Sequence, residues 1–279
     1  MISFCNFLQR FCVKQSETIK KTRSMKKLIL LFAVAVATLL TSCISVQTVK
    51  SDKPVKSEKR QAAPFERVRL LGTPTVYYAQ GDTISIRVEA PEDLLEYVVT
   101  ESKDSCLTIR ISDQAMNLIR NQSIISGDDI SVYVTSPDII EVSVSGSGDF
   151  KSDQRIDTDN LRVELKGSGD ISLADIICDH LSTSLVGSGD VRIDKVVAQS
   201  SAIEMVGSGD LKINHENVAN TNVLLKGSGD IVASFLNCGN VVSELRGSGD
   251  ITFSGDVRSL TNSQLGSGDY HINRLNIKH

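Results

Sequence analysis

A four-residue motif, Gly-Ser-Gly-Asp, recurs seven times in the second half of this chain. Successive copies begin 21, 20, 20, 20, 20 and 19 residues apart. A repeat of this length is one supersecondary unit that cannot bury its own apolar side chains, whereas copies stacked in register can. A β-propeller blade needs about 40 residues, so the spacing favours a solenoid. The copies begin at Gly146, Gly167, Gly187, Gly207, Gly227, Gly247 and Gly266.

The residues on either side of each motif alternate between apolar and polar. After the second motif the chain reads Ile171, Ser172, Leu173, and the apolar positions before the third motif include Leu181 and Leu185. Alternation with a period of two is typical of a strand with one buried face. The sequence therefore predicts an all-β fold, a parallel β-helix with about 20 residues per coil, in which equivalent residues form rows about 4.8 Å apart.

The part of the chain before the first motif is less regular. Residues 65–145 contain strand-like runs rich in Val, Ile, Thr and Tyr but no motif, and a long loop is expected over 113–127. We interpret 65–145 as irregular opening coils that close the first end of the solenoid. The GSGD repeats then occupy 146–279, so that 65–279 forms one β-helical domain.

The N-terminal segment has the pattern of an export signal. Residues 25–42 begin with Met-Lys-Lys, continue through an apolar run that is short for a membrane span, and end in Leu-Thr-Ser before Cys43. The run Leu40 to Cys43 resembles a bacterial lipobox, which implies lipidation of Cys43 after cleavage. We expect translation to start at Met25, which makes 1–24 an upstream extension outside the native protein.

Residues 43–64 then form the lipidated cysteine and a polar, flexible tether. The expected location is the bacterial cell envelope, at the outer membrane or facing the periplasm, with the membrane contacted through the lipid at Cys43. An ordinary signal peptide with an incidental cysteine is the alternative. The sequence does not indicate whether the anchor lies in the inner or the outer membrane.

The charge of the body limits the possible partners. Residues 1–64 hold 12 of the 30 Lys and Arg and 3 of the 34 Asp and Glu, so the rest carries 18 basic and 31 acidic side chains, a net charge of −13. Such a balance disfavours nucleic acid and permits cations. Cys178 and Cys238 occupy one column three rungs apart, about 14 Å, so we expect buried free thiols rather than a disulfide.

The motif aspartates form one column of the repeat. The structural interpretation is that each glycine permits a tight turn and each carboxylate accepts backbone N–H bonds. The functional alternative is a file of bound divalent cations, although one Asp and one Ser per coil supply few of the six to eight oxygens that Ca²⁺ prefers. The column contains Asp149, Asp170, Asp190, Asp210, Asp230, Asp250 and Asp269.

No arrangement of residues indicates catalysis. His180 and His215 stand at different offsets in their coils, His271 lies in an outward column, and we expect all of them at the surface. Gly-Ser-Gly-Asp is not the Gly-x-Ser-x-Gly turn of serine hydrolases. We predict no catalytic residues, no metal site and no cofactor. The outward column that could bind a partner includes Lys151, Arg192, Lys212 and Thr252.

These motifs, together with Phe65 to Val68, Asp82 to Glu89 and Leu107 to Ile111, resemble the bacterial family described as putative auto-transporter adhesin, head GIN domain. The resemblance covers roughly 65–279. It implies a right-handed β-helix in a lipoprotein or secreted protein, and it implies no established chemistry.

Three functions remain open from the sequence. The first is a structural or adhesive module, without catalysis, that contacts glycan or envelope protein through rows of outward side chains. The second is a glycan-active enzyme resembling polysaccharide lyases or hydrolases, for which the irregular stretch 113–129 with Arg120, Asp128 and Asp129 is the candidate site. The third is a calcium-binding repeat module. The oligomeric state is also open, because Tyr270–His279 offers an unpaired strand edge.

Overall fold

The computed structural model describes residues 48–49, 53–114, 124–125 and 130–278 of the chain. The chain divides into two units, 1–47 and 48–279, and only the second contains described residues. The upstream extension 1–24, the signal 25–42 and Cys43 lie outside the described residues, as do Arg120, Asp128 and Asp129. Within the described ranges, no helix has the length and apolar character needed to cross a membrane.

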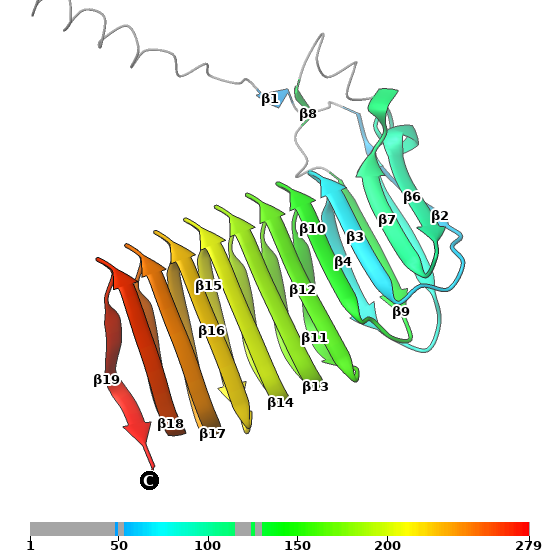
Figure 1. The fold of residues 1–279 in the computed structure, drawn as a ribbon. Coiled ribbons are helices and arrows are strands. Elements are labelled where there is room, and N and C mark those ends of the chain that lie inside the picture. Colours follow the sequence, from blue (N-terminus) through cyan, green and yellow to red (C-terminus); the bar gives the residue numbers. More distant parts are fainter. Residues whose placement is uncertain (1–47, 50–52, 115–123, 126–129, 279) are drawn as a thin grey trace, which may run out of the picture. The chain divides into compact units, whose positions relative to one another are not determined.

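The second unit is a β-solenoid with two facing walls, which we call wall A and wall B (Figure 1). Wall A contains β6 (Val98–Lys103), β7 (Cys106–Ile111), β3 (Arg67–Gly72), β10 (Glu141–Gly146), β12 (Asn160–Gly167) and β16 (Asn220–Gly227). Wall B contains β2 (Val55–Arg60), β5 (Ser85–Pro91), β9 (Ser131–Ser136), β4 (Thr75–Gln80), β11 (Phe150–Asp157), β15 (Asp210–Glu216) and β19 (Tyr270–Ile277).

Four long strands bend at a corner and contribute to both walls, the first half of each to wall B and the second half to wall A. They are β13 (Ile171–Gly187), β14 (Val191–Gly207), β17 (Asp230–Gly247) and β18 (Ile251–Gly266). Two short segments outside the walls, β1 (Thr48–Val49) and β8 (Ile124–Ile125), pair in parallel. The 3₁₀ turn η1 (Leu95–Tyr97) lies within the segment that follows β5.

The repeats stack in parallel and in register, as the spacing predicts. The first glycine of each motif pairs with the first glycine of the next, from Gly146 through Gly167 and Gly187 to Gly266. Each coil therefore places equivalent side chains in straight rows along the solenoid. The prediction of a β-helix with coils of about 20 residues is confirmed.

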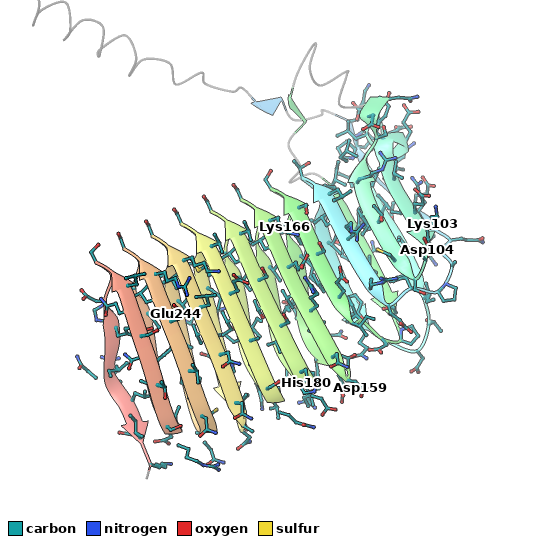
Figure 2. All side chains as sticks on the ribbon, in the orientation of Figure 1. Lys103, Asp104, Asp159, Lys166, His180 and Glu244 are labelled. Atoms are coloured by element: carbon teal, nitrogen blue, oxygen red, sulfur yellow. The ribbon has the colours of Figure 1, made fainter. Side chains whose placement is uncertain are left out.

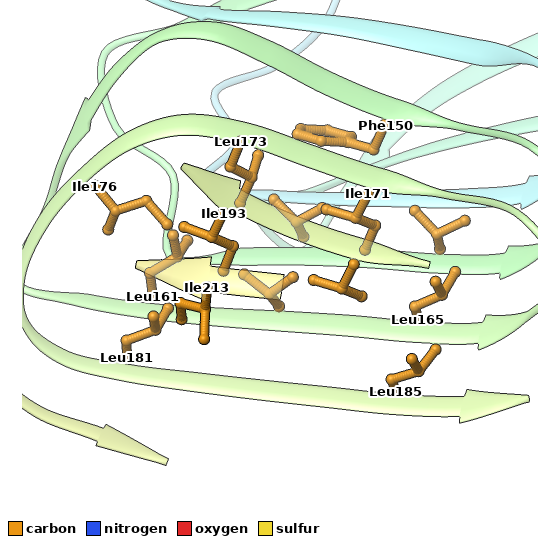
Figure 3. Close-up of a cluster of buried hydrophobic side chains, with 14 of the residues drawn as sticks. Phe150, Leu161, Leu165, Ile171, Leu173, Ile176, Leu181, Leu185, Ile193 and Ile213 are labelled. Carbon is orange, nitrogen blue, oxygen red and sulfur yellow. The ribbon is translucent and has the colours of Figure 1, made fainter. Parts of the chain in front are cut away.

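The alternating apolar residues fill the space between the walls. Leu161, Leu165, Leu181 and Leu185 project inward from wall A toward the side chains of wall B, which include Ile171 (Figure 3). All five side chains are at most 2% exposed. Full burial of one Leu or Ile side chain contributes about 1.5–3 kcal/mol, so each added coil contributes its own share to the core.

Antiparallel strands close the first end of the solenoid. On wall B, β5 pairs antiparallel with β9 and with the edge strand β2, while on wall A the edge strand β6 pairs antiparallel with β7. Both edge strands are charged, with Lys56 and Lys59 on β2 and Lys103 on β6. Charged edge strands discourage pairing with other chains. Because β2 spans Val55–Arg60, part of the segment 43–64 that the sequence indicates as tether is a strand of wall B.

The second end is closed by polar and aromatic side chains. Strand β19 covers only the first half of β18, and the inward positions of the uncovered half are Leu260, Asn262 and Gln264, where the preceding coil has Val241, Ser243 and Leu245. The Tyr270 hydroxyl donates to the carbonyl oxygen of Ser263 at 3.0 Å. The outermost coil thus exposes amides rather than a fully apolar core.

Candidate functional site

The glycines of the GSGD turns have a steric cause at the edge where wall A turns into wall B. At Gly187 the backbone φ is +138°, a left-handed conformation that favours glycine. A Cβ added to Gly187 would collide with the carbonyl oxygen of Gly167, and a Cβ added to Gly189 with that of Gly169. Both positions therefore require glycine, because the turns of adjacent coils lie in direct backbone contact.

The same turns are joined by hydrogen bonds between coils. The N–H groups of Ser188 and Gly189 both donate to the carbonyl oxygen of Gly167, at 2.9 and 3.1 Å. In the coils that are stacked between two other coils, the serine side chain of the motif is exposed to solvent. The turns thus act as a backbone ladder, and the serine hydroxyls contribute a row of small polar groups at the surface.

Each motif aspartate joins its coil to the next one. The Asp190 N–H donates to Oδ1 of Asp170 at 3.1 Å, and the Asp250 N–H donates to Oδ1 of Asp230 at 2.9 Å. All six successive pairs from Asp149 to Asp269 make this contact, at 2.9–3.3 Å. The structure thus places the predicted aspartates in one row, with one oxygen of each of the first six carboxylates engaged by backbone.

Nearby cations and N–H groups favour the charged form of some of these carboxylates. Lys151 Nζ lies 2.9 Å from Oδ2 of Asp149, and this hydrogen bond raises the pKa of Lys151. At Asp250, the N–H of Asp269 and then the His271 ring lower the carboxyl pKa. In the described part of the chain, no three His, Cys, Asp or Glu side chains form a group that could hold a metal ion.

The outer face of wall A contains a groove with a volume of about 420 Å³. Its floor lies over β13 and β14, where Ser182, Ser184 and Ala202 are small, and one rim is formed by Asn222 and Leu224 of β16. Arg162, Glu204 and Glu244 supply the charges that line it. Figure 2 shows Glu244 and Lys166 among the side chains of the solenoid.

The charges around this groove neutralise one another. Glu164 pairs with Arg162, whose Nε lies 2.8 Å from Oε1, and also with Lys166 at 3.4 Å. The hydrogen bond from Arg162 is the largest cause that lowers the pKa of Glu164. Glu204 pairs with Lys226 at 2.9 Å, and Glu244 pairs with Arg246. A general acid near neutral pH would need a raised pKa, whereas the pKa of Glu164 is lowered.

The expectation that His215 lies at the surface is wrong. Its side chain is 2% exposed, its ring stacks on Phe235 with centroids 5.1 Å apart, and Nε2 lies 3.0 Å from Oγ of Ser201. Burial lowers the pKa of His215 to about 4. No catalytic role follows from this contact, because both side chains are buried in the core and a substrate has no access to them.

His180, His271, Cys178 and Cys238 lie where the sequence indicates. His180 and His271 are exposed, and His180 Nδ1 lies 2.8 Å from the Ser200 hydroxyl of the next coil. Cys178 and Cys238 are buried free thiols, and burial raises the pKa of both. The thiolate is the reactive form, so neither cysteine is suited to nucleophilic chemistry.

The outward column predicted to bind a partner lies on wall B. Lys151, Arg192, Lys212 and Thr252 stand in one row, with Ser172 and Val232 at the intervening rungs. Because the motif aspartates stand two residues earlier on the same strands, this face combines a basic row with an acidic one. Sequence reasoning missed the groove of wall A. Its signal is small residues at adjacent rungs, where Ser182 and Ala202 stand between Arg162 and Asn222.

The fold and this surface place the protein among the parallel β-solenoids that are built from repeats, and ion pairs cover its outer walls. The chain belongs to the family described as putative auto-transporter adhesin, head GIN domain, which matches residues 64–198 and 195–279. The proposed resemblance is confirmed. A search of curated proteins finds no match.

Three solved structures share the fold. A putative adhesin from Bacteroides fragilis NCTC 9343 is 22% identical, with a TM-score of 0.69 over 80% of this chain and 99% of that one. A putative adhesin from Parabacteroides distasonis ATCC 8503 is 19% identical, with a TM-score of 0.66 over 81% and 99%. A putative lipid binding protein from the same strain is 18% identical, with a TM-score of 0.57 over 81% and 99%.

Proposed function

We propose that this protein is an exported lipoprotein of the cell envelope that displays a non-catalytic binding module. The observation that supports the binding role most directly is the arrangement of outward side chains in straight rows, one residue per coil, on both walls. Rows of equivalent groups suit weak contacts repeated along a polymer, which together give useful avidity. The names of the related structures, two of them putative adhesins, support the same role.

The absence of catalysis is part of the proposal. An enzyme acting on glycans needs a carboxylic acid and a carboxylate placed on either side of the bond to be cleaved. The carboxylates at the groove of wall A are held by Arg162, Lys226 and Arg246 instead. The hydrogen bond from Arg162 lowers the pKa of Glu164, which opposes a general-acid role for that carboxyl.

The lipid anchor rests on the sequence from Leu40 to Cys43. A diacylglyceryl group and a further acyl chain at Cys43 would hold the protein at a membrane, because each buried CH₂ contributes about 0.8 kcal/mol. The tether after Cys43 would then carry the solenoid away from the lipid surface.

The test uses cells that express the full chain and are fed an alkyne-tagged fatty acid. We expect labelling of the protein and its recovery with membranes, both lost in Cys43→Ser and both retained in Cys106→Ser as a matched control. The intact cells should also bind isolated envelope material more than cells that lack the protein. Equal labelling of Cys43→Ser would contradict the anchor, and absence of any added binding would contradict the binding role.

A further inference from the structure

The groove of wall A is the feature from which a ligand class can be argued. It is open to solvent, it lies in the middle of wall A, and its volume of about 420 Å³ falls within the range of small-molecule sites. The groove is formed by strands β12, β13, β14 and β16. Each of these strands pairs with a neighbouring strand on both sides. The groove therefore offers no free backbone edge to a peptide strand.

The charge of the groove excludes strongly charged ligands. Arg162, Glu204 and Glu244 line it, and each is paired with an opposite charge of the same wall. A polyanion would meet two carboxylates at the rim, and no unpaired cation of the lining would attract it. Nucleic acids and acidic polysaccharides bind through uncompensated Lys and Arg. The groove thus suits a ligand without net charge.

The remaining groups of the groove suit a polyhydroxylated ligand. Ser182 and Ser184 present hydroxyls, Asn222 presents an amide, and the rim carboxylates add acceptors. Small apolar surfaces lie between them, at Ala202 and at Val242, which is 50% exposed. Sugar rings combine hydroxyl groups with apolar C–H surfaces, so this alternation matches them, whereas protein interfaces depend on large buried aromatic or Arg anchors.

We propose that the groove over Ser182, Ser184 and Ala202 binds a neutral oligosaccharide chain. This inference rests on the proposed binding function and names its ligand class. The described lining contains no aromatic ring on which a sugar could stack. A single groove therefore binds weakly, with a Kd of about 1 mM, and tight attachment comes from many copies on one surface acting on one polymer.

The test measures binding of defined sugars to the full chain in detergent micelles by calorimetry and saturation-transfer NMR. The neutral probes are maltohexaose, cellohexaose, mannohexaose and the N-acetylglucosamine hexamer, and the acidic probe is hexagalacturonate. We expect at least one neutral probe to bind with an affinity that changes less than twofold between 50 and 500 mM NaCl, because no ion pair forms with the ligand. Hexagalacturonate should bind at least tenfold more weakly.

A pair of matched variants locates the binding. Ser182→Phe fills the groove and should weaken binding at least tenfold, while Ser188→Phe, the same change at an exposed serine of a GSGD turn outside the groove, should change it less than twofold. Ser182→Ala, which leaves the shape almost unchanged, should weaken binding about fivefold, as expected for one hydrogen bond. Unchanged thermal unfolding of all three variants verifies that each is folded.

Three results would overturn the inference. They are no binding of any neutral probe at 10 mM, salt-sensitive binding of hexagalacturonate instead, or equal losses in Ser182→Phe and Ser188→Phe. Cells that express the Ser182→Phe variant distinguish a failure of this inference from a failure of the proposed binding function. If they still bind envelope material like the wild type, the binding module stands and its ligand, a protein included, lies elsewhere on the surface.

Discussion

The buried imidazole of His215 makes the stability of this solenoid depend on pH. The ring of His215 lies between Phe235 and Ser201, and burial lowers its pKa from the ordinary 6.5 to about 4. In the unfolded chain the same histidine titrates near 6.5. Between these two values the unfolded state binds a proton that the folded state does not, so stability falls as the pH falls through this window.

We therefore expect acid to destabilise the protein through His215. The free energy of unfolding should drop by about 3 kcal/mol between pH 7 and pH 4, beyond the change caused by other groups. His215→Phe, which continues the aromatic stack to Phe235, should remove this part of the pH dependence. Chemical denaturation at pH 7 and pH 4 measures it, with His180→Gln as the exposed control. A wild type and a His215→Phe variant with the same pH profile would contradict this account.

The position of His215 could not be found by counting from the motif. In the earlier coils the buried corner residue, Ile176 or Val196, follows the motif aspartate by six residues, but His215 follows Asp210 by five. The coil keeps its length because it has one additional residue in the next turn, where Asn217 adopts a left-handed φ of +56°. Strict alternation from Leu211 and Ile213 is the sequence signal that places His215 inward, because residues two apart on a strand share one face.

Along the strand ladder, the aspartate column acts as a connection between turns. Each of the first six carboxylates accepts an N–H group from the next coil, and in the first coil Asp149 also accepts a bond from Lys151. A row of like charges about 4.8 Å apart repels itself, and these hydrogen bonds offset that repulsion. Asparagine side chains also form hydrogen bonds between adjacent coils. For example, Asn237 Nδ2 donates to Asn217 Oδ1 at 2.8 Å.

This explanation predicts the effects of changing Asp230. Asp230→Ala removes the acceptor of the Asp250 N–H and should cost about 1 kcal/mol in the free energy of unfolding. Asp230→Asn keeps an acceptor oxygen and removes one repelling charge, so its cost should be smaller. Ser228→Ala, in the same turn, is the control, and denaturant midpoints measure all three.

Calcium distinguishes the two interpretations of this column. If the aspartates serve the turns, 5 mM CaCl₂ should shift the unfolding temperature by less than about 1 °C, because a ligand stabilises only the state that binds it. A saturable rise of several degrees in the wild type, abolished in Asp230→Asn, would instead establish the cation file.

Some elements follow from the sequence and others depend on distant pairing. The coils from Gly146 onward follow from the motif and from alternation, because neighbours in space are neighbours in the repeat. The antiparallel strands β2, β5 and β6 carry no such signal, since each pairs according to a partner that the local sequence does not specify. The groove of wall A depends on side-chain size at adjacent rungs, which a pattern of polar and apolar residues does not record.

Across the whole solenoid, stability is a sum of similar contributions. Each coil contacts mainly the coils before and after it, as in other repeat proteins, and the ends are protected by different devices. Charged edge strands close the first end, and Tyr270 with polar inward residues closes the second. The outer walls are therefore free to vary without disturbing the core, which suits a surface whose role is recognition.

The register of the coils is tested most directly by distances between the exposed motif serines. Pairs of spin labels, one at Ser147 and the other at Ser208, Ser228, Ser248 or Ser267, can be measured by pulsed electron paramagnetic resonance in a chain whose native cysteines are replaced. The account predicts separations that grow by about 4.8 Å with each coil, to about 29 Å for Ser147 and Ser267. Separations that do not increase in even steps would contradict the stacked solenoid and every surface assigned to it.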